Sequence, residues 1–280
     1  MPLTPQQIIH YYYSGGGGTP VYEPEYQAAL NAGFGTPPAT DAGKLAESNL
    51  IKTAKALGLW DAAARFYIMD SVSADPDWKS INYKDVGNLS TYILRVNSPA
   101  TAAKEGFTGN GTTQYLNFQF IPSTQGGSIF TLNDAGIIAY AGLNIAANGV
   151  SLFGALSIAN VDGISLNPWR LSDNKLTCAL NGEFVEALTV GEGNGLYIIR
   201  RTTSNQIRVS RNGGSESVFS SMSGSLAPIS VYGLARNVGG SADSFSTNRL
   251  DLFIPVKGSA ISPADINTWY NNWIIERDAV

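Results

Sequence analysis

Short apolar runs, many of them alternating with polar residues, recur along the chain from about residue 65 onward. They are rich in Ile, Val, Leu, Tyr and Phe, which favour the pleated surface of a β-sheet. The predicted strands cover residues 65–69, 90–96, 114–120, 136–143, 152–158, 175–180, 195–201, 206–210, 229–235 and 249–256. Asn-Gly and Asp-Gly pairs lie between many of these runs and accept the positive φ angles of tight hairpins. The pattern predicts a mainly β fold, with an antiparallel sandwich over residues 65–280.

Two segments show a helical period instead. Residues 41–64 carry apolar side chains at close to helical spacing, with Thr40 or Asp41 as the N-cap and Gly58 as the residue that ends the first helix. We interpret this segment as a helical linker. A last helix begins after Ser262, where Pro263 occupies the first turn. Its apolar stripe contains Ile266, Trp269, Tyr270, Trp273 and Ile274.

Residues 1–40 show neither period. They contain three adjacent tyrosines (Tyr11, Tyr12 and Tyr13), a run of four glycines and two stretches that contain proline. Glycine loses much backbone freedom on folding, so the glycine run resists ordering by itself. The segment is either a flexible arm or an arm that orders against a partner, and the tyrosines favour the second because aromatic side chains supply contact area at interfaces. We interpret residues 1–40 as an extended attachment arm that Tyr11, Tyr12 and Tyr13 anchor to a partner.

Charge and composition narrow the classes of partner. Charged residues make up 14 % of the 280 residues, the formal net charge is -4, and the sequence contains no run of lysine or arginine. Duplex binding requires a patch of phosphate-neutralising cations, so nucleic acid is not an expected partner. No apolar stretch approaches the roughly 18 residues of a membrane span, and no membrane is expected either. The first residues lack the basic and apolar regions of a secretory signal.

The candidate catalytic residues do not form a recognised set. Cys178 and His10 are the only residues of their kinds, which excludes an internal disulfide and a closed zinc site. Cys178 lies in an alternating run and is expected to be a buried thiol, whereas His10 lies in the irregular arm. Glu183 and Glu186 have an odd spacing, which sends them to opposite faces of a strand, whereas a glycosidase pair must face one site. We predict that the protein is not an enzyme.

Four segments resemble concanavalin A-like, laminin-G-like jelly-roll domains. Residues 106–117 look like an early strand pair of these domains, and residues 261–269 resemble their short closing helix. Residues 197–200 and 207–213 resemble a hairpin with an Asn-Gly turn. Residues 58–61, 66–67 and 81–84 resemble a layout found in bacteriophage structural proteins that carry this domain. The resemblance covers roughly residues 57–275 and implies a jelly-roll sandwich.

For function, the resemblance implies a non-enzymatic virion structural protein of tail, fibre or capsid-associated type, assembled in the host cytoplasm. Its arm would hold it to other virion proteins, it would form a homo-oligomer, and its sandwich would project for adhesion to a surface or a host glycan. The alternative is a lectin-like carbohydrate-binding module. A glycoside hydrolase ranks last because the paired-carboxylate motif of the relatives is absent.

Sugar binding would use a flat aromatic ring beside planar polar groups. The loop residues that fit this description are Trp78, Trp169 and Arg170, whereas Trp60, Trp269 and Trp273 are expected in the core.

Lectins of this fold often hold calcium near the glycan, and calcium takes several oxygen ligands. The oxygen-rich stretches contain Asp162, Asn167, Asp173 and Asn174, and separately Asn237 and Asp243. Neither stretch has an EF-hand-like spacing, so no cofactor is expected and calcium is the ion to test for.

Overall fold

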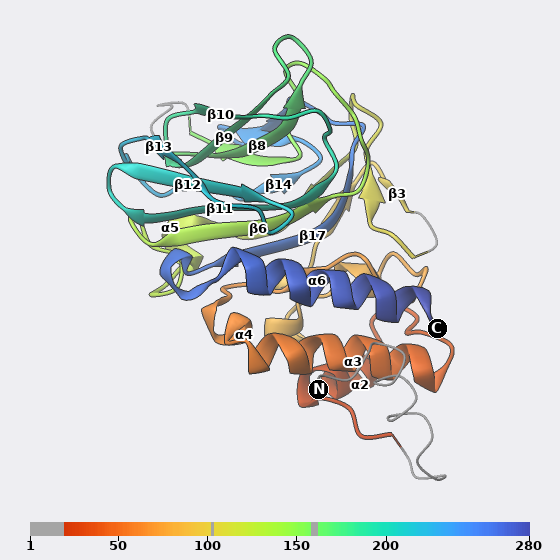
Figure 1. The fold of residues 1–280 in the computed structure, drawn as a ribbon. Helices are drawn as coiled ribbons and strands as arrows, with labels where there is room; N and C mark the ends of the chain where they lie inside the picture. The colour runs from red at the N-terminus through yellow and green to blue at the C-terminus, as the bar shows by residue number, and fades with distance from the viewer. Residues whose placement is uncertain (1–19, 102–103, 158–161) are drawn as a thin grey trace.

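The computed structural model describes residues 20–101, 104–157 and 162–280. Its strands form two sheets stacked face to face, and a layer of helices covers the outer face of one sheet (Figure 1). The predicted jelly-roll-like β-sandwich is therefore confirmed. Within these ranges, no helix combines the length and apolarity that crossing a bilayer demands.

The first sheet, called sheet A, has the strand order β13-β12-β11-β6-β17-β4-β3, with β1 also paired to β17. Its strands are β1 (Tyr67–Ile68), β3 (Ala100–Thr101), β4 (Phe107–Thr108), β6 (Ala135–Ala141), β11 (Gly195–Thr203), β12 (Gln206–Arg211), β13 (Ser217–Ser220) and β17 (Arg249–Val256). The predicted strands over residues 195–201 and 206–210 form the β11–β12 hairpin, with Ile199 opposite Val209.

The second sheet, called sheet B, has the order β10-β9-β8-β7-β14-β5-β2, and β15 joins it beside β7. Its strands are β2 (Leu94–Val96), β5 (Tyr115–Asn117), β7 (Phe153–Leu156), β8 (Gly163–Arg170), β9 (Lys175–Gly182), β10 (Val185–Thr189), β14 (Tyr232–Gly233), β15 (Arg236–Val238) and β16 (Ser241–Asp243). Strand β8 is absent from the sequence prediction because Asn167 and Pro168 interrupt its apolar pattern.

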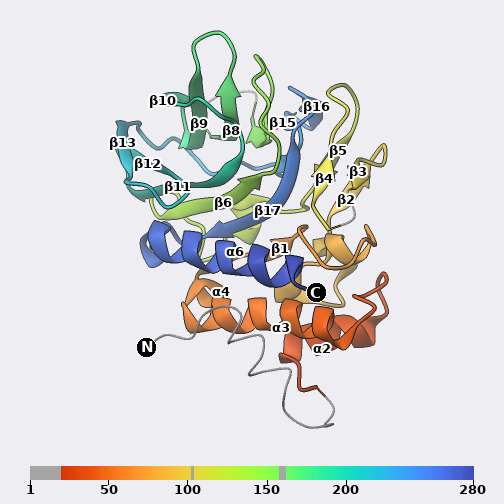
Figure 2. The same cartoon turned by 45° about the vertical axis from the view of Figure 1, so that its right-hand side comes forward.

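The helices lie together on the outer face of sheet A (Figures 1 and 2). They are α2 (Pro24–Ala32), α3 (Asp41–Ala56), α4 (Leu59–Ala62) and α6 (Pro263–Asp278), while the short α5 (Pro122–Gln125) lies outside this layer. The predicted caps are confirmed: the Thr40 side chain accepts a hydrogen bond from the Gly43 amide, and Ser262 accepts one from the Asp265 amide. Gly58 follows α3 with a φ of 72°, the left-handed conformation that ends helices.

The central strands of sheet A are buried on both faces. In β6, Ile137 points into the core between the sheets, and Ile138 points into a second core beneath the helices. In β17, Phe253 and Ile254 divide in the same way. If only sheet B covered sheet A, the apolar side chains on the other face of sheet A would be exposed to water. The helical layer that covers them is therefore part of the same folding unit.

The helical layer corrects two predictions about the N-terminal part of the chain. Residues 24–32 form helix α2, so the expected extended arm is wrong over this stretch. The Tyr26 side chain is buried, and its hydroxyl donates to Glu47 Oε2 of α3 at 3.1 Å. Helices α3 and α4 occupy most of residues 41–64, as predicted, but they pack against α6 and sheet A and do not serve as a linker. Residues Tyr11, Tyr12 and Tyr13 lie outside the described residues.

Charged groups are buried where the helical layer meets the sandwich. Asp70 is 1 % exposed and accepts hydrogen bonds from Tyr270 Oη at 2.9 Å and from Arg277 Nη1, both of α6. Asp251 of β17 accepts hydrogen bonds from Arg249 and from the Gly106 amide. Burial, followed by the charge of Asp251, raises the pKa of Asp70 to about 7, although the bonds from Arg277 and Tyr270 oppose the change.

This raised pKa predicts a loss of stability between about pH 4 and pH 7 as the pH rises. The Asp70 carboxyl ionises near its ordinary pKa in the unfolded chain, whereas in the folded chain it keeps its proton to about pH 7. The folded state therefore binds more protons in this range, and the contribution of Asp70 to the unfolding free energy falls as the pH rises. We expect Asp70→Asn to remove this contribution, which is measured as a flatter pH profile in urea unfolding.

The control is Asp61→Asn, because Asp61 is exposed. Its pH profile should follow that of the wild type. If Asp70→Asn shifts stability by the same amount at every pH, the titration assigned to Asp70 is wrong.

Candidate functional site

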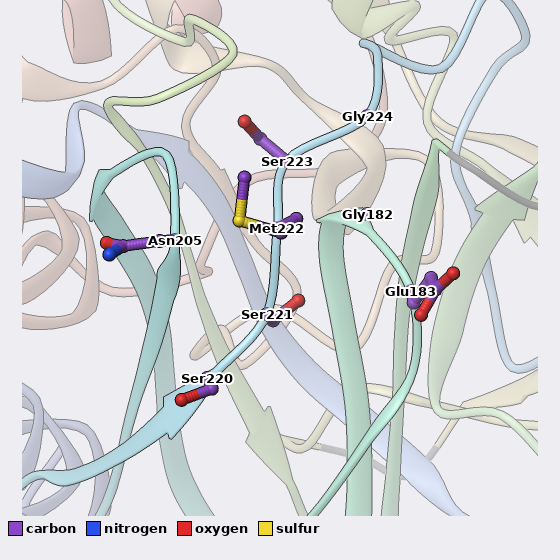
Figure 3. A pocket seen from close by; sticks show the side chains of 8 residues that line it. All are labelled: Gly182, Glu183, Asn205, Ser220, Ser221, Met222, Ser223 and Gly224. Atoms are coloured by element: carbon purple, nitrogen blue, oxygen red, sulfur yellow. The ribbon is translucent and has the colours of Figure 1, made fainter.

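One hollow in the described structure lies where an edge of sheet A meets an edge of sheet B. It has a volume of about 660 Å³. The connection from β9 to β10, the β11–β12 turn and the segment after β13 form its wall (Figure 3). The lining residues are Gly182, Glu183, Asn205, Ser220, Ser221, Met222, Ser223 and Gly224. Hydroxyl and amide groups thus share the surface that a ligand would meet with apolar groups, among them the exposed Met222 side chain.

Main-chain hydrogen bonds fix the shape of this hollow. The Ser221 amide donates to Asn205 O at 3.0 Å, and the Ser223 amide donates to Ser204 O at 2.7 Å. An isolated bridge between Gly182 and Ser223 ties sheet B to the segment that follows β13. A Cβ atom on Gly182 would lie 2.4 Å from Met222 O, so this close approach requires glycine.

Several polar groups of the lining have no partner in the described part of the chain. The Asn205 amide oxygen accepts from Thr203 at 3.0 Å, but its nitrogen makes no hydrogen bond there. Neither the Ser220 hydroxyl nor the Glu183 carboxylate has a partner within the same residues, and all three side chains are exposed. By contrast, the Ser223 hydroxyl bonds to Asn133 Oδ1 at 2.7 Å. The hollow therefore offers donors and acceptors that a polar ligand could use.

Arg201 connects the two sheets beneath the hollow. Its Nε donates to Leu180 O in β9 at 3.0 Å, and its Nη1 donates to Ser204 O at 3.1 Å and to Ser221 O at 2.7 Å. Its Nη2 donates to the Ser221 hydroxyl at 3.2 Å. The sequence contains a signal for this arrangement, since Tyr197, Ile199 and Arg201 alternate along β11 and the first two point into the core. Arg201 is nevertheless absent from the predicted site residues.

Trp78 is not available to a ligand, so its prediction as a binding residue is wrong. The side chain is 1 % exposed, and its Nε1 donates to Glu47 Oε2 at 2.9 Å. Its ring meets the Tyr26 ring edge-on at 5.7 Å. Trp60, Trp269 and Trp273 are buried, as predicted.

Trp169 and Arg170 lie together at the opposite end of β9 from the hollow, in the β8–β9 hairpin that projects from the sandwich (Figure 2). The Trp169 ring is partly buried against the core between the sheets, and its Nε1 donates to Asn174 Oδ1 at 3.1 Å. Arg170 forms ion pairs with Asp173 and with Glu186. The hairpin therefore supplies one partly exposed ring beside a guanidinium that two carboxylates already contact.

The two glutamates considered for catalysis have separate environments. Glu183 lines the hollow, whereas Glu186 lies in β10 and pairs with Arg170 and Lys175. Hydrogen bonds from Lys175 and then from Arg170 lower the pKa of Glu186. Cys178 is buried, as predicted, and burial raises the pKa of its thiol to about 12.

The proposed calcium ligands contact protein donors. Asp162 Oδ1 accepts from the Ser157 amide at 2.8 Å, Asp173 pairs with Arg170, and Asp243 pairs with Arg236. Asn237 Oδ1 accepts from the Gly240 amide at 2.9 Å. Across residues 20–101, 104–157 and 162–280, no group of three or more His, Cys, Asp or Glu residues is arranged to hold a metal ion.

A group of stacked rings lies on the outer side of sheet B. Tyr115 of β5 and Tyr232 of β14 stack at 4.6 Å between ring centroids, and Phe245 lies 6.2 Å from Tyr115. Their strand neighbours Leu116 and Val231 point into the core, so the two tyrosines point away from it. Neither tyrosine is among the predicted site residues, because their strands are paired only in the folded chain.

Comparison with known proteins identifies the fold and no family. No family model matches the chain, and no curated protein matches it. Among solved structures, a mutant Trypanosoma rangeli sialidase displaying trans-sialidase activity is 11 % identical with a TM-score of 0.50, covering 82 % of this chain and 40 % of the sialidase. At this identity the likeness shows a shared β-sandwich fold.

Two further structures are similar at lower scores. Domain 4 of AbnA, a GH43 extracellular arabinanase from Geobacillus stearothermophilus in complex with arabinotriose, has a TM-score of 0.46 and 13 % identity, covering 74 % of this chain and 98 % of that domain. The botulinum neurotoxin serotype D binding domain has a TM-score of 0.49 and 11 % identity, covering 77 % of this chain and 53 % of that domain.

The shape of the hollow depends on Gly182, which yields a prediction. Gly182→Ala forces the new methyl group against Met222 O, and we expect a loss of about 1–3 kcal/mol in unfolding free energy from overpacking. Gly191→Ala is the matched control, because no heavy atom lies within 4 Å of its added Cβ. Chemical denaturation of both variants measures the difference. Equal stabilities would show that the bridge between Gly182 and Ser223 is not held at the distance described.

Proposed function

We propose that the protein is a non-enzymatic, lectin-like binding module that takes a carbohydrate in the hollow between the β9–β10 connection, the β11–β12 turn and the segment after β13. The observation that carries the proposal is the lining itself. Exposed amide, hydroxyl and carboxylate groups of Asn205, Ser220 and Glu183 are among the groups that line an open space of about 660 Å³. Sugars present many hydroxyl groups, and such a lining can hydrogen-bond several of them at once.

The absence of a second carboxylate from the lining supports binding without hydrolysis. Glycosidases of the common type use two carboxyl groups, on either side of the scissile bond. Of the residues that line the hollow, only Glu183 is titratable. Glu186, the nearest carboxylate along the chain, pairs with Lys175 at 2.8 Å and with Arg170. A bound sugar would therefore meet one acidic group.

Glycan binding and its loss in a lining variant test the proposal. Asn205→Ala removes an exposed amide donor, and we expect about a fivefold weaker affinity for the best glycan, as one net hydrogen bond predicts. A glycan array identifies that glycan, and calorimetry measures the affinities of wild type and variant. Asn271→Ala, an exposed asparagine on α6, is the matched control and should bind like the wild type.

Two further variants decide between the hollow and other surfaces. Trp169→Ala alters the β8–β9 hairpin, and Tyr115→Ala removes one of the stacked rings on sheet B. Both should keep the affinity of the wild type. If Trp169→Ala or Tyr115→Ala loses glycan binding while Asn205→Ala keeps it, the site lies elsewhere, and if the wild type binds no glycan, the proposed function is wrong.

We further propose that this module is a component of a bacteriophage particle, held to other virion proteins and to copies of itself by its N-terminal residues. The support for this setting is the sequence resemblance of residues 58–61, 66–67 and 81–84. We assign attachment to the residues before residue 20, and the support for this choice is that residues 20–40 contribute α2 to the packed helical layer.

Deleting residues 1–19 tests attachment. We expect the truncated chain to keep the melting temperature of the full chain within about 2 °C, because the residues that the structure describes already form both cores among themselves. Incorporation into purified particles, measured by mass spectrometry, should fall below a tenth of the full-length level, a loss of about 1.4 kcal/mol or more in binding. Normal incorporation of the truncated chain, or absence of the full chain from particles, contradicts the proposal.

A further inference from the structure

Arg201 is a buried cation without an acidic partner in the described part of the chain. It is 0 % exposed, and the acceptors of its hydrogen bonds are the carbonyl oxygens of Leu180, Ser204 and Ser221 and the Ser221 hydroxyl. All of these acceptors are uncharged. Burying a charge is costly unless an opposite charge or several hydrogen bonds compensate it, and here hydrogen bonds alone do so.

Its neighbours on the same hairpin behave differently. Arg200 and Arg208 both lie within ion-pair distance of Glu216, and Arg211 lies 3.4 Å from Glu192. These arginines are partly exposed, and Arg201 is the fully buried one. The arginines that face solvent therefore have a carboxylate nearby, whereas Arg201, which faces inward, has none among the described residues.

Arg201 reaches the hollow through Ser221. Ser221 lines the hollow, and its hydroxyl oxygen accepts a hydrogen bond from Arg201 Nη2 at 3.2 Å. Because the oxygen accepts this bond, the hydroxyl proton of Ser221 is free to be donated to another acceptor. The positive charge of Arg201 next to the oxygen makes the hydroxyl a stronger donor. A Cβ atom on Gly182 would lie 3.3 Å from Arg201 Nη2, so the guanidinium is directly behind the main chain of the lining.

Resting on the proposed carbohydrate function, we propose that the hollow prefers acidic glycans, with the anionic group of the sugar bound beside Ser221. A carboxylate there would accept the Ser221 hydroxyl proton and would lie near the unmatched positive charge of Arg201. Charge-assisted hydrogen bonds are about twice as strong as neutral ones, and the effect is largest where water is excluded. Glu183, exposed at the lip, opposes an anion only weakly because solvent screens it.

Paired oligosaccharides test this preference on the full-length protein. Each pair has the same sugar backbone, once with free uronic acid or sialic acid carboxylates and once as the methyl ester, and a second set pairs sulfated with unsulfated chains. We expect the carboxylate form to bind about tenfold more tightly than its ester. Added salt should weaken binding of the acidic form and leave the neutral form unchanged. A preference confined to the sulfated chains would contradict the assignment of a carboxylate.

Two variants locate the effect at Ser221. Ser221→Ala should abolish the preference for the acid over its ester, whereas the control Ser223→Ala, whose hydroxyl bonds to Asn133, should keep it. Glu183→Gln should raise affinity for the acidic member of each pair and not for the neutral one. Arg201 itself is left unchanged, because its hydrogen bonds join three segments of the fold.

The outcomes separate this inference from the proposed function. Equal affinity for acid and ester in the wild type overturns the acidic preference and leaves carbohydrate binding in place. A preference that survives Ser221→Ala also overturns it, because the anion is then bound elsewhere. Failure of every oligosaccharide to bind, neutral or acidic, overturns the proposed function itself.

Discussion

Burial of sheet A on both faces is the constraint on which the rest of the structure depends. The side chains of β6, β11 and β17 point alternately into two cores. If either row were exposed to water, the strand would lose most of its apolar burial. Sheet B covers one row, and helices α3, α4 and α6 cover the other. The Trp269 indole, which donates to Leu50 O at 3.2 Å, links α6 to α3 and closes this second core. The helices are therefore as much a part of the sandwich as its strands.

The local parts of the fold were predictable from the sequence because local chemistry decides them. Every predicted run contains a strand, and the capping residues Thr40 and Ser262 do what their side chains favour at helix starts. The burial of Trp78 was not predictable in this way. Its neighbours Asp75 and Asp77 are typical of an exposed loop, and its partners Glu47 and Tyr26 lie far from it in the sequence.

The hollow was hidden from sequence reasoning for the same physical reason. Its wall joins three connections whose residues are brought together only when the edges of the two sheets approach each other. One part could have been found: the alternation along β11 places Arg201 on the inward face, and an inward cation at the end of a core strand is a recognisable anomaly. The residues predicted to bind a sugar were instead Trp78, Trp169 and Arg170, because aromatic rings are evident in a sequence and depth of burial is not.

The helical layer also determines on which side of the molecule the two ends of the described part lie. The described chain enters through α2 and leaves through α6, so both ends emerge from the same side of the sandwich (Figure 1). A support tethered at either end of the described part would therefore lie on the helical side of each copy. The strand connections on the opposite side would face away from that support. On a crowded support this geometry would favour many weak contacts made in parallel over one strong contact, since neighbouring copies would offer the same face to the same surface.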